Sequence, residues 1–561
     1  MTFFSYEYQV LLELQEIVRE WVYKVSLAQG MPEEIASEHG ARIYTFGSYR
    51  IGVNQPNADI DTLCIAPRNI NRSRDFFGLI DPSTQKLPDE ELVLYHILRK
   101  RPEVSEILAV PESHVPVLKL TFSGVDLDLT CACLQMTSIP PKLDILNDKI
   151  LRNIDDASQR SCNGVRVAAA TLNLVPSIEN FRTTLRTIKY WASQRAISAN
   201  KLGYFGGIQC SLLTARICQL YPNAVPSFLV SRFFRVYSNW KWPMPLLLNN
   251  VSQGNPPVGA KVWNPYGPNA RDLMPIITPA YPAMNSSFNV SRSTLRAIQD
   301  EILRGKEIVD KIYEHVEKTS EKSNDISKNS TTENGDELQQ EEITWQMLFA
   351  KSEFFSDYKN LLQIDIFADT PAALNKWSGW VESRLRHLIQ RLEYCPEIKQ
   401  IRLFTKGFTG NPNHKKDHCI TYFVGLKFAT SGDKEGGGRR QVDIGIPVTE
   451  WKVHSVEIFR ERTMGMGVDL AHVKNVDLPE WIKEQIPPIV KRKKKKKKKR
   501  KSKDAKEKGE EEKGAVEKEM QTPDSTGKRR REENGDVDEV KKSRLSEGND
   551  GGSAVAVVSS A

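Results

Sequence analysis

The chain of 561 residues has no run of eighteen apolar residues and no segment that reads as a secretion signal. A helix that crosses a bilayer needs about 20 mostly apolar residues, so the sequence predicts no membrane-spanning helix. Its eight cysteines form no C-x-x-C pairs of the kind that bind zinc, and they lie in mostly apolar contexts. We therefore expect buried free thiols in an intracellular, soluble protein.

A net charge is also lacking over most of the chain. Residues 491–561 contain 23 Lys and Arg against 15 Asp and Glu, which accounts for the whole net charge of +8. Residues 1–490 are therefore neutral overall, and a polyanion would have to bind them through local patches. Eleven consecutive basic residues at 491–501 and a second basic cluster at 528–531 fit both importin recognition and non-specific attraction of nucleic acid.

The most informative pattern is a Phe-Gly-Ser turn at residues 46–48, followed after ten residues by Asp-Ile-Asp. Side chains alternate between the two faces of an extended strand, so Asp59 and Asp61 would point the same way. Two carboxylates on one face repel each other unless a cation lies between them. Gly47 permits a tight turn, and the Ser48 side chain with the following N–H groups can hold a phosphate.

A second acidic strand supports this interpretation. In the strand-like run 124–129, Asp126 and Asp128 share one face while apolar residues take the other. Acidic side chains from two strands beside a Gly-Ser turn suit a two-metal phosphoryl-transfer site. The alternative is an ordinary solvated strand face, because D-x-D is common on exposed strands.

The sequence around these residues resembles the eukaryotic nuclear poly(A) polymerases, which belong to the DNA polymerase beta-like nucleotidyltransferase superfamily. The resemblance covers about residues 8–460, and its first block is FGSYRIGVNQPNADIDTLCIAP at 46–67. The other blocks are VPVLKL (115–120), SCNGVRV (161–167), NFRTTLRTIKYWA (180–192), LGYFGGI (202–208) and LMPIITPAYPAMNSSFNVS (273–291). The resemblance implies a template-independent polynucleotide adenylyltransferase. It would add AMP from ATP to the 3′ hydroxyl of pre-mRNA, with release of pyrophosphate, in mRNA 3′-end polyadenylation.

The resemblance also implies the metal site. Asp59, Asp61 and Asp128 would be both the catalytic residues and the ligands of two Mg²⁺ or Mn²⁺ ions. Asp126 matches an acidic position that is not a ligand in the family, so we expect it to be a surface acid.

The nucleotide and RNA contacts follow in the same way. The RNA 3′ end would be contacted by Lys119 and Asn289. Ser198 stands where the family has a tyrosine, which predicts weaker or less selective nucleotide binding. The residues that would contact ATP are Phe46, Gly47, Ser48, Asn163, Lys189, Ser198, Gly207, Ile208 and Thr278.

The pattern of elements and the resemblance together predict an α+β fold in four parts. These are a nucleotidyltransferase palm with a mixed sheet and helices, a helical middle domain, a ferredoxin-like RNA-binding domain and a disordered basic tail. The predicted boundaries are 1–160 for the N-terminal helix and palm, 161–362 for the middle domain with a low-complexity insertion at 317–342, 363–465 for the RNA-binding domain, and 466–561 for the tail with its nuclear localisation signals.

Within these parts, hydrophobic periodicity predicts individual helices and strands. Thr370 is the expected N-cap of a helix that starts at Pro371. The predicted helices cover 8–28, 178–192, a stretch that begins after Gly206-Gly207, 371–394 and 451–462, and the predicted strands cover 43–46, 59–66, 115–122, 125–133, 398–404, 419–428 and 441–448.

The implied partners are the RNA 3′ end, ATP, subunits of a cleavage and polyadenylation complex, and an importin. We expect no membrane contact, and a monomer that works within a larger complex in the nucleus. Family members usually carry some tens of residues before the first helix, and these are absent here.

Three alternatives stay open. A transferase that adds uridine or mixed nucleotides, or a CCA-adding enzyme, would share the same carboxylates. A catalytically silent RNA-binding scaffold would keep the fold, although three intact aspartates argue against it. A DNA polymerase of the same superfamily lacks support, because no helix-hairpin-helix pattern is apparent.

Overall fold

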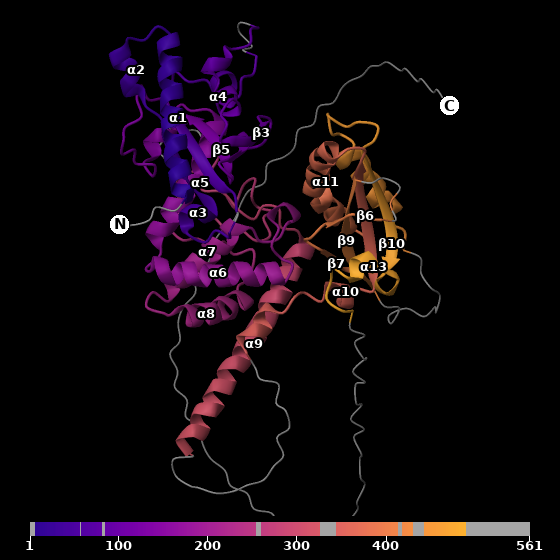
Figure 1. Cartoon of the computed structure of the whole chain (residues 1–561). Helices are drawn as coiled ribbons and strands as arrows, with labels where there is room; N and C mark the ends of the chain where they lie inside the picture. The colour runs from indigo at the N-terminus through magenta and orange to yellow at the C-terminus, as the bar shows by residue number, and fades with distance from the viewer. Residues whose placement is uncertain are drawn as a thin grey trace, which may run out of the picture. The chain divides into compact units, whose positions relative to one another are not determined.

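The structure of the chain is a computed structural model (Figure 1). The chain divides at residue 493 into two units. The elements described below all belong to the first unit. The described residues are 6–489, except for 57, 81–84, 254–259, 326–343, 413, 415–417 and 430–441.

The N-terminal part is built on a five-stranded mixed sheet with the order β1-β2-β5-β4-β3. β2 and β5 are parallel, and the other neighbouring pairs are antiparallel. The predicted palm is confirmed; the edge strand β3 is an addition that the sequence did not predict. The strands are β1 (Arg42–Thr45), β2 (Ile60–Ala66), β3 (Val104–Val110), β4 (Val117–Phe122) and β5 (Val125–Cys133).

Helices cover both faces of this sheet. The apolar stripe of α1 (Tyr6–Ala28) packs in one cluster with inward-facing residues of β2, β4 and β5. Residues of α5 (Asp156–Leu174) pack in a second cluster with the alternate residues of β2 and β5. Three shorter helices complete the palm: α2 (Glu33–His39), α3 (Gly47–Ile51) and α4 (Leu94–Arg99).

The middle part is helical, and side-chain caps fix where its helices begin. Asp155 accepts hydrogen bonds from two backbone N–H groups of α5, and Ser177 caps α6 in the same manner. On α6, Phe181, Leu185 and Ile188 are buried at helical spacing. The further helices are α6 (Ile178–Gln194), α7 (Gly207–Leu220), α8 (Pro226–Ser238) and α9 (Arg292–Asp325).

The C-terminal part is a β-α-β-β-α-β unit whose main strands pair antiparallel in the order β10-β6-β9-β7. This is the ferredoxin-like arrangement that was predicted. The Thr370 side chain caps α11 at Ala373 N, also as predicted. The elements are α10 (Phe354–Asp357), β6 (Asn360–Ala368), α11 (Pro371–Leu392), β7 (Ile398–Leu403), β8 (Phe408–Thr409), β9 (His418–Phe428), α12 (Gly445–Trp451), β10 (Gly467–Lys474) and α13 (Glu480–Lys483).

Two secondary-structure predictions in this part were wrong. Residues 445–448 of the predicted strand at 441–448 form the start of α12, which is followed by a helical turn at Lys452–Val456, and residue 441 lies outside the described residues. The strand β10 lies inside the predicted tail, where it pairs with β6 along its whole length. Because β6 already has β9 on its other side, β10 completes the sheet and leaves no central place for residues 441–448.

Three predicted boundaries also fall inside elements. α5 crosses residue 160, and β6 begins before residue 363. α9 continues to Asp325, so the first part of the predicted insertion at 317–342 is helical. The remainder of that insertion, and the tail from residue 490, lie outside the described residues.

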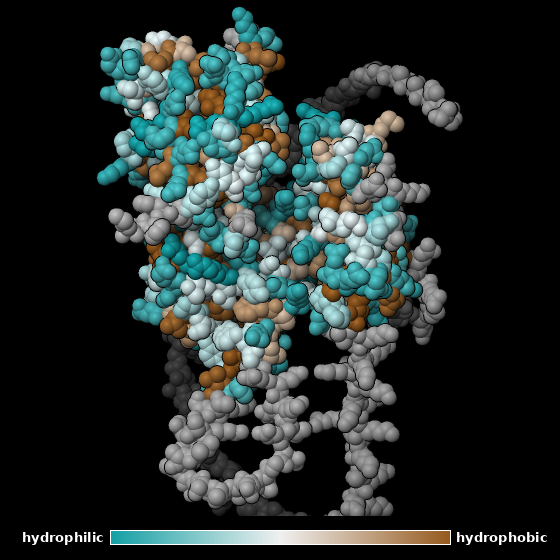
Figure 2. Space-filling view, in the orientation of Figure 1, coloured by the Kyte–Doolittle hydropathy of each residue, from teal (hydrophilic) through white to brown (hydrophobic). Residues whose placement is uncertain are grey.

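Two expectations from composition can be compared with the structure. All eight cysteines are free and six of them are buried. Within the described ranges, no helix is both long enough and apolar enough to cross a membrane. On the face drawn in Figure 2, hydrophobic and hydrophilic residues are interspersed.

Candidate active site

The two acidic strands of the palm are direct neighbours. β2 and β5 run parallel, and Asp61 lies opposite Asp128 in their register. Asp59 stands just before the first residue of β2, and both Asp59 and Asp128 act on the Asp61 carboxylate through their charge. The structure thus brings together the three aspartates that the sequence singled out.

The electrostatics of Asp61 reflect this crowding. Burial, and then repulsion from Asp59 and Asp128, raise the pKa of Asp61 to about 6, against the opposing influence of Lys119. Lys119 lies opposite Asp128 in the β4–β5 register, and its Nζ is 2.7 and 2.5 Å from the two carboxylate oxygens. The site therefore carries more negative charge than Lys119 alone offsets.

The donor set fits a divalent cation. In the described part of the chain, no three His, Cys, Asp or Glu side chains stand ready-assembled as a metal site. Lys119 gives a reason, since its ammonium engages both oxygens of Asp128. The donors are all carboxylate oxygens, the type that Mg²⁺ and Mn²⁺ prefer, and their mutual repulsion favours a cation among them.

The predicted Gly-Ser turn packs directly against Asp61. Phe46 N donates to Asp61 O at 3.0 Å, and α3 begins at the next residue. Gly47 has a φ of +60°, and a Cβ at this position would overlap Asp61 Oδ2. Only glycine therefore lets the turn approach the carboxylate this closely.

A cavity of about 460 Å³ opens beside the turn. Its walls come from the palm and from α5, α6 and α7, and they are mostly apolar with a few polar groups, as is usual for nucleotide and small-molecule sites. Seven of the predicted residues line it: Phe46, Gly47, Ser48, Asp61, Lys189, Gly207 and Ile208.

Lys189 supplies a positive charge to this cavity. Its ammonium donates to Val53 O at 3.1 Å, and it forms no ion pair with any described residue. Burial lowers the pKa of Lys189. A lysine that is half-buried without a carboxylate partner is suited to receive a phosphate. One and two turns earlier on α6, Arg186 and Arg182 bind carbonyls at the end of α3.

Sequence reasoning missed other cavity residues, of which Gly164 is the most telling. This glycine is in the interior of α5, and a Cβ there would lie 2.7 Å from a ring atom of Phe46. It lets the helix and the turn approach each other. A glycine inside a helical pattern was the available signal. Val53 and Ser211 also line the cavity, and nothing in their sequence context marks them.

Asn163 directly precedes the lining residue Gly164, but neither Asn163 nor Thr278 lines the cavity. The Oδ1 of Asn163 is buried and has no hydrogen-bond partner among the described residues. Its Nδ2 is 3.8 Å from Met284 Sδ. Thr278 is buried and its Oγ1 accepts a hydrogen bond from Met284 N at 2.9 Å. Met284 therefore connects the two predicted residues.

The structure places Ser198 and Asn289 differently from the prediction. Ser198 is exposed, forms a β-bridge with Phe205 and does not line the cavity. Asn289 is buried, and its Nδ2 donates to Asn200 O at 3.0 Å. In this conformation Asn289 stabilises a loop and does not face a surface that RNA could reach.

A second cavity, of about 740 Å³, lies along the strands on the side of Asp59 and Asp128. Lys119 lines it, together with Glu106 and Leu108 of the edge strand. Asp61 lines the first cavity, and the other two aspartates line the second. The carboxylate cluster therefore lies between the two cavities.

A mixed palm sheet with carboxylates on two adjacent strands, beside a Gly-Ser turn and a lysine-bearing cavity, defines a nucleotidyltransferase. Enzymes of this class use divalent metals and nucleoside triphosphates. The chain belongs to the poly(A) polymerase family. Three family models match it: the poly(A) polymerase nucleotidyltransferase domain over residues 5–175, the central domain over 180–323, and the predicted RNA binding domain over 353–418 and 409–495.

Two relatives in particular agree with this assignment. The chain is 42% identical to the poly(A) polymerase of Dictyostelium discoideum over 495 residues, which cover 87% of this chain and 56% of the relative. It is 40% identical to nuclear poly(A) polymerase 1 of Arabidopsis thaliana over 476 residues, which cover 84% of this chain and 60% of the relative. The chain thus spans less than two thirds of these relatives. A solved structure of the Cid1 poly(U) polymerase matches with a TM-score of 0.37 and 14% identity, over 62% of this chain and 94% of that one.

Proposed function

We propose that this chain is a polynucleotide adenylyltransferase that adds AMP from ATP to the 3′ hydroxyl of RNA without a template. The observation that carries the proposal is the register of Asp61 with Asp128, since Asp61 lines one cavity and Asp128 lines the other. Membership in the poly(A) polymerase family supports adenylate as the nucleotide and RNA as the acceptor.

The reaction requires two substrates to meet at the carboxylates. The RNA 3′ oxygen forms a bond to the α-phosphorus of ATP, and the bond from that phosphorus to the bridging oxygen breaks. Pyrophosphate leaves, and the hydroxyl proton passes to solvent. With the nucleotide in the first cavity and the RNA end in the second, the chain supplies proximity and orientation, which contribute much of the rate in such reactions.

The aspartates are proposed as the ligands of two Mg²⁺ or Mn²⁺ ions, held by Asp59, Asp61 and Asp128. Such ions, when bound, lower the pKa of the attacking hydroxyl and offset charge on the leaving pyrophosphate. Lys119 must release Asp128 when a cation takes its place. Its ammonium would then be free for the RNA backbone, which supports its predicted RNA contact.

The first cavity suggests how ATP would lie. Gly47, Ser48 and Lys189 would face the triphosphate, because they combine free backbone N–H groups with a cation. Gly207 and Ile208 would form the wall for the nucleoside. The unpartnered Oδ1 of Asn163 could accept a hydrogen bond from a ribose hydroxyl.

Three of the predicted nucleotide and RNA contacts, Thr278, Ser198 and Asn289, line neither cavity. Thr278 would contact the adenine only indirectly, through Met284, because its Oγ1 already accepts a hydrogen bond from Met284 N. Ser198 and Asn289 would contact ATP and RNA only if their loops moved, since neither faces a cavity in this structure.

We also propose that the protein is carried into the nucleus by an importin and acts there as a monomer within a larger 3′-end processing complex. The Arabidopsis relative is named as a nuclear enzyme, and the basic run at 491–501 supports nuclear import.

Extension of a labelled oligo(A) RNA by the purified chain tests the proposal, with each single nucleoside triphosphate in Mg²⁺ and again in Mn²⁺. A long ladder with ATP alone is the expected result. Equal or better use of UTP would instead make the chain a uridylyltransferase. No extension with any nucleotide and either metal would identify a silent RNA-binding scaffold.

A further inference from the structure

The chain between α6 and α7, residues 195–206, leads directly to the nucleotide cavity. The next two residues, Gly207 and Ile208, line that cavity. Within the segment, Phe205 N donates to Ile197 O at 3.1 Å, so its two ends are tied together. At the exit, Gly206 N donates to Gln209 Oε1 at 2.6 Å. A shift of the 195–206 segment would therefore move the cavity wall.

The backbone of this segment needs external support. Ala196 has a φ of +52°, in the left-handed region that residues other than glycine seldom occupy. Such a conformation persists only where the surrounding structure holds it in place.

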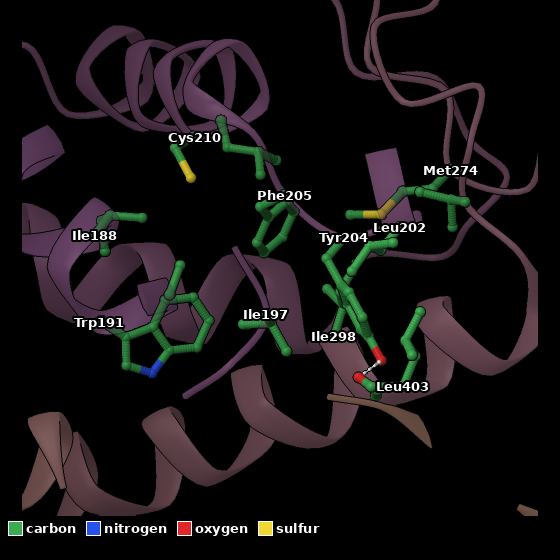
Figure 3. Close-up of a cluster of buried hydrophobic side chains, with 14 of the residues drawn as sticks. Ile188, Trp191, Ile197, Leu202, Tyr204, Phe205, Cys210, Met274, Ile298 and Leu403 are labelled. Atoms are coloured by element: carbon green, nitrogen blue, oxygen red, sulfur yellow. Dashed lines mark hydrogen bonds between the residues drawn. The ribbon is translucent and has the colours of Figure 1, made fainter. Parts of the chain in front are cut away.

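Part of that support comes from β7, which lies at one edge of the ferredoxin-like sheet, opposite β10. Figure 3 shows the Tyr204 ring among buried apolar side chains, with its hydroxyl donating to Leu403 O at 2.9 Å. Arg402, the preceding residue of β7, donates from Nη2 to Arg195 O at 2.8 Å. The C-terminal part of the chain thus contacts the 195–206 segment near both of its ends.

A buried ion network fixes this junction. Glu301 of α9 accepts hydrogen bonds from Arg195 Nε at 2.8 Å and from Arg402 Nη2 at 3.0 Å. All three side chains are at least nine-tenths buried. Burial raises the pKa of Glu301, but the two guanidiniums prevail and lower it overall. Because separation of these charges would leave one of them buried and unpaired, the network favours a single arrangement.

We propose that Tyr204 and Arg402 are positioning residues through which the ferredoxin-like module sets the nucleotide-facing turn at Gly207 and Ile208. Neither side chain lines the cavity, so both act through the 195–206 segment. This inference rests on the proposed function, because it takes ATP to bind in that cavity. Burial raises the pKa of Tyr204 to about 12, so its hydroxyl stays protonated and remains a donor.

The test replaces Tyr204 by phenylalanine in the full chain, which keeps the packed ring and removes only the hydroxyl. We expect the KM for ATP to rise about fivefold, the effect of removing one buried hydrogen bond, while the KM for oligo(A) and kcat stay within about twofold. The Kd for MgATP, measured without RNA, should rise by the same factor. A variant that merely folded less completely would lose kcat and leave both constants for ATP unchanged.

The matched control is Tyr237→Phe. Tyr237 is a buried tyrosine of α8 whose hydroxyl donates to Leu213 O of α7 at 2.6 Å, and not to a residue of β7. The Tyr237→Phe variant should lose about as much thermal stability as the Tyr204→Phe variant, while its KM for ATP does not change. Should Tyr204→Phe not fold, Lys201→Ala tests the same junction, because it removes an exposed ion pair between the segment and Glu382 of α11. Its KM for ATP should rise about twofold.

An unchanged Kd for MgATP in the Tyr204 variant, or an equal rise in the Tyr237 variant, overturns the inference. The proposed function fails by a different result, the absence of any RNA extension by the wild-type chain. Since the Kd for MgATP is measured without RNA, it decides the inference in either case.

Discussion

At the residue scale, the backbone conformation of Gly47 lets the Gly-Ser turn lie directly against the proposed metal ligand Asp61. Two separate constraints act on Gly47: its φ of +60°, and the Asp61 oxygen that a Cβ would overlap. Gly124 offers a matched comparison in the same sheet region, because it has a φ of +76° but no heavy atom within 4 Å of the place that a Cβ would take. A comparison of the two glycines therefore distinguishes the cost of backbone strain, which both share, from the cost of a steric clash, which only Gly47 has.

We predict that Gly47→Ala lowers oligo(A) extension at least about 100-fold, since the methyl group must displace Asp61 or the turn. Gly124→Ala carries only the backbone penalty, about 1 kcal/mol, and should keep near-normal activity with a lower melting temperature. Single-turnover extension and thermal unfolding of both variants measure these effects. Equal activity losses in the two variants would mean that backbone strain, and not contact with Asp61, explains why glycine is needed at position 47.

A second comparison separates Asp61 from Asp126, which lies on β5 and accepts a hydrogen bond from Thr121 Oγ1 at 2.6 Å. Asp61→Ala should abolish extension and leave RNA binding nearly intact, because removal of a metal ligand costs far more than removal of a surface charge. Asp126→Asn should retain extension within a few-fold of wild type. Residual activity above roughly a tenth of wild type for Asp61→Ala would contradict the metal assignment.

These residues also show what the sequence could and could not predict. Asp61 and Asp128 could be predicted from the sequence, because strand alternation determines which side chains share a face independently of the rest of the chain. Ser198 and Asn289 lie on connecting segments, whose orientation depends on distant partners such as Phe205 and Asn200. Alternation and helical periodicity say nothing about such segments, so the resemblance alone selected them.

At the scale of elements, residues 441–448 show the same limit. Their β-branched residues alternate in the sequence, but the side chain of Ile446 is 72% exposed in α12. The real edge strand β10 has a weaker pattern, with exposed Asp469 and His472. Pairing with β6, and not local propensity, decides which run becomes the strand. The long helices α1, α6 and α11 were predictable because periodicity extends over many turns.

The helix α11 carries a basic cluster whose effect depends on pH. Burial, and then the charges of Arg386, Arg384 and Arg391, lower the pKa of His387 to about 4. An unfolded histidine has a pKa near 6.5, so the unfolded chain binds a proton more readily between these values. The contribution of His387 to stability is therefore full above pH 6.5 and is lost as the pH falls towards 4.

We predict that, because of His387, the free energy of unfolding of the wild type falls by about 1 kcal/mol when the pH is lowered from 7.5 to 5. This is roughly half of what the full shift would give, because the ring is only partly buried and solvent screens the neighbouring charges. His387→Gln should reduce that pH dependence by about the same amount, as measured by urea unfolding at the two pH values. His472→Gln, at an exposed position of β10, is the control. An unchanged pH dependence in the His387 variant would show that the proton is bound elsewhere.

At the scale of the whole molecule, charge and catalysis are assigned to different parts of the sequence. The family models and both cavities lie within residues 5–495, while the net charge of +8 comes entirely from residues 491–561. Catalytic contacts with RNA are therefore local, such as that proposed for Lys119. Long-range attraction of RNA should come from the basic run at 491–501.

We predict that a chain ending at residue 489 still extends oligo(A) with ATP, but with an RNA affinity that depends less on salt. On single-stranded RNA, each phosphate that the protein no longer neutralises reduces the slope of log affinity against log salt by about 0.7, so a fall of at least about 2 units is expected. RNA binding measured over a series of KCl concentrations gives the two slopes directly.

A full-length variant with glutamine in place of the basic residues at 491–501 is the control for length. If it matches the shortened chain, the effect comes from charge, because its length is that of the wild type. Equal slopes for all three proteins would place the electrostatic attraction within residues 1–490 instead, in patches on a body that has no net charge.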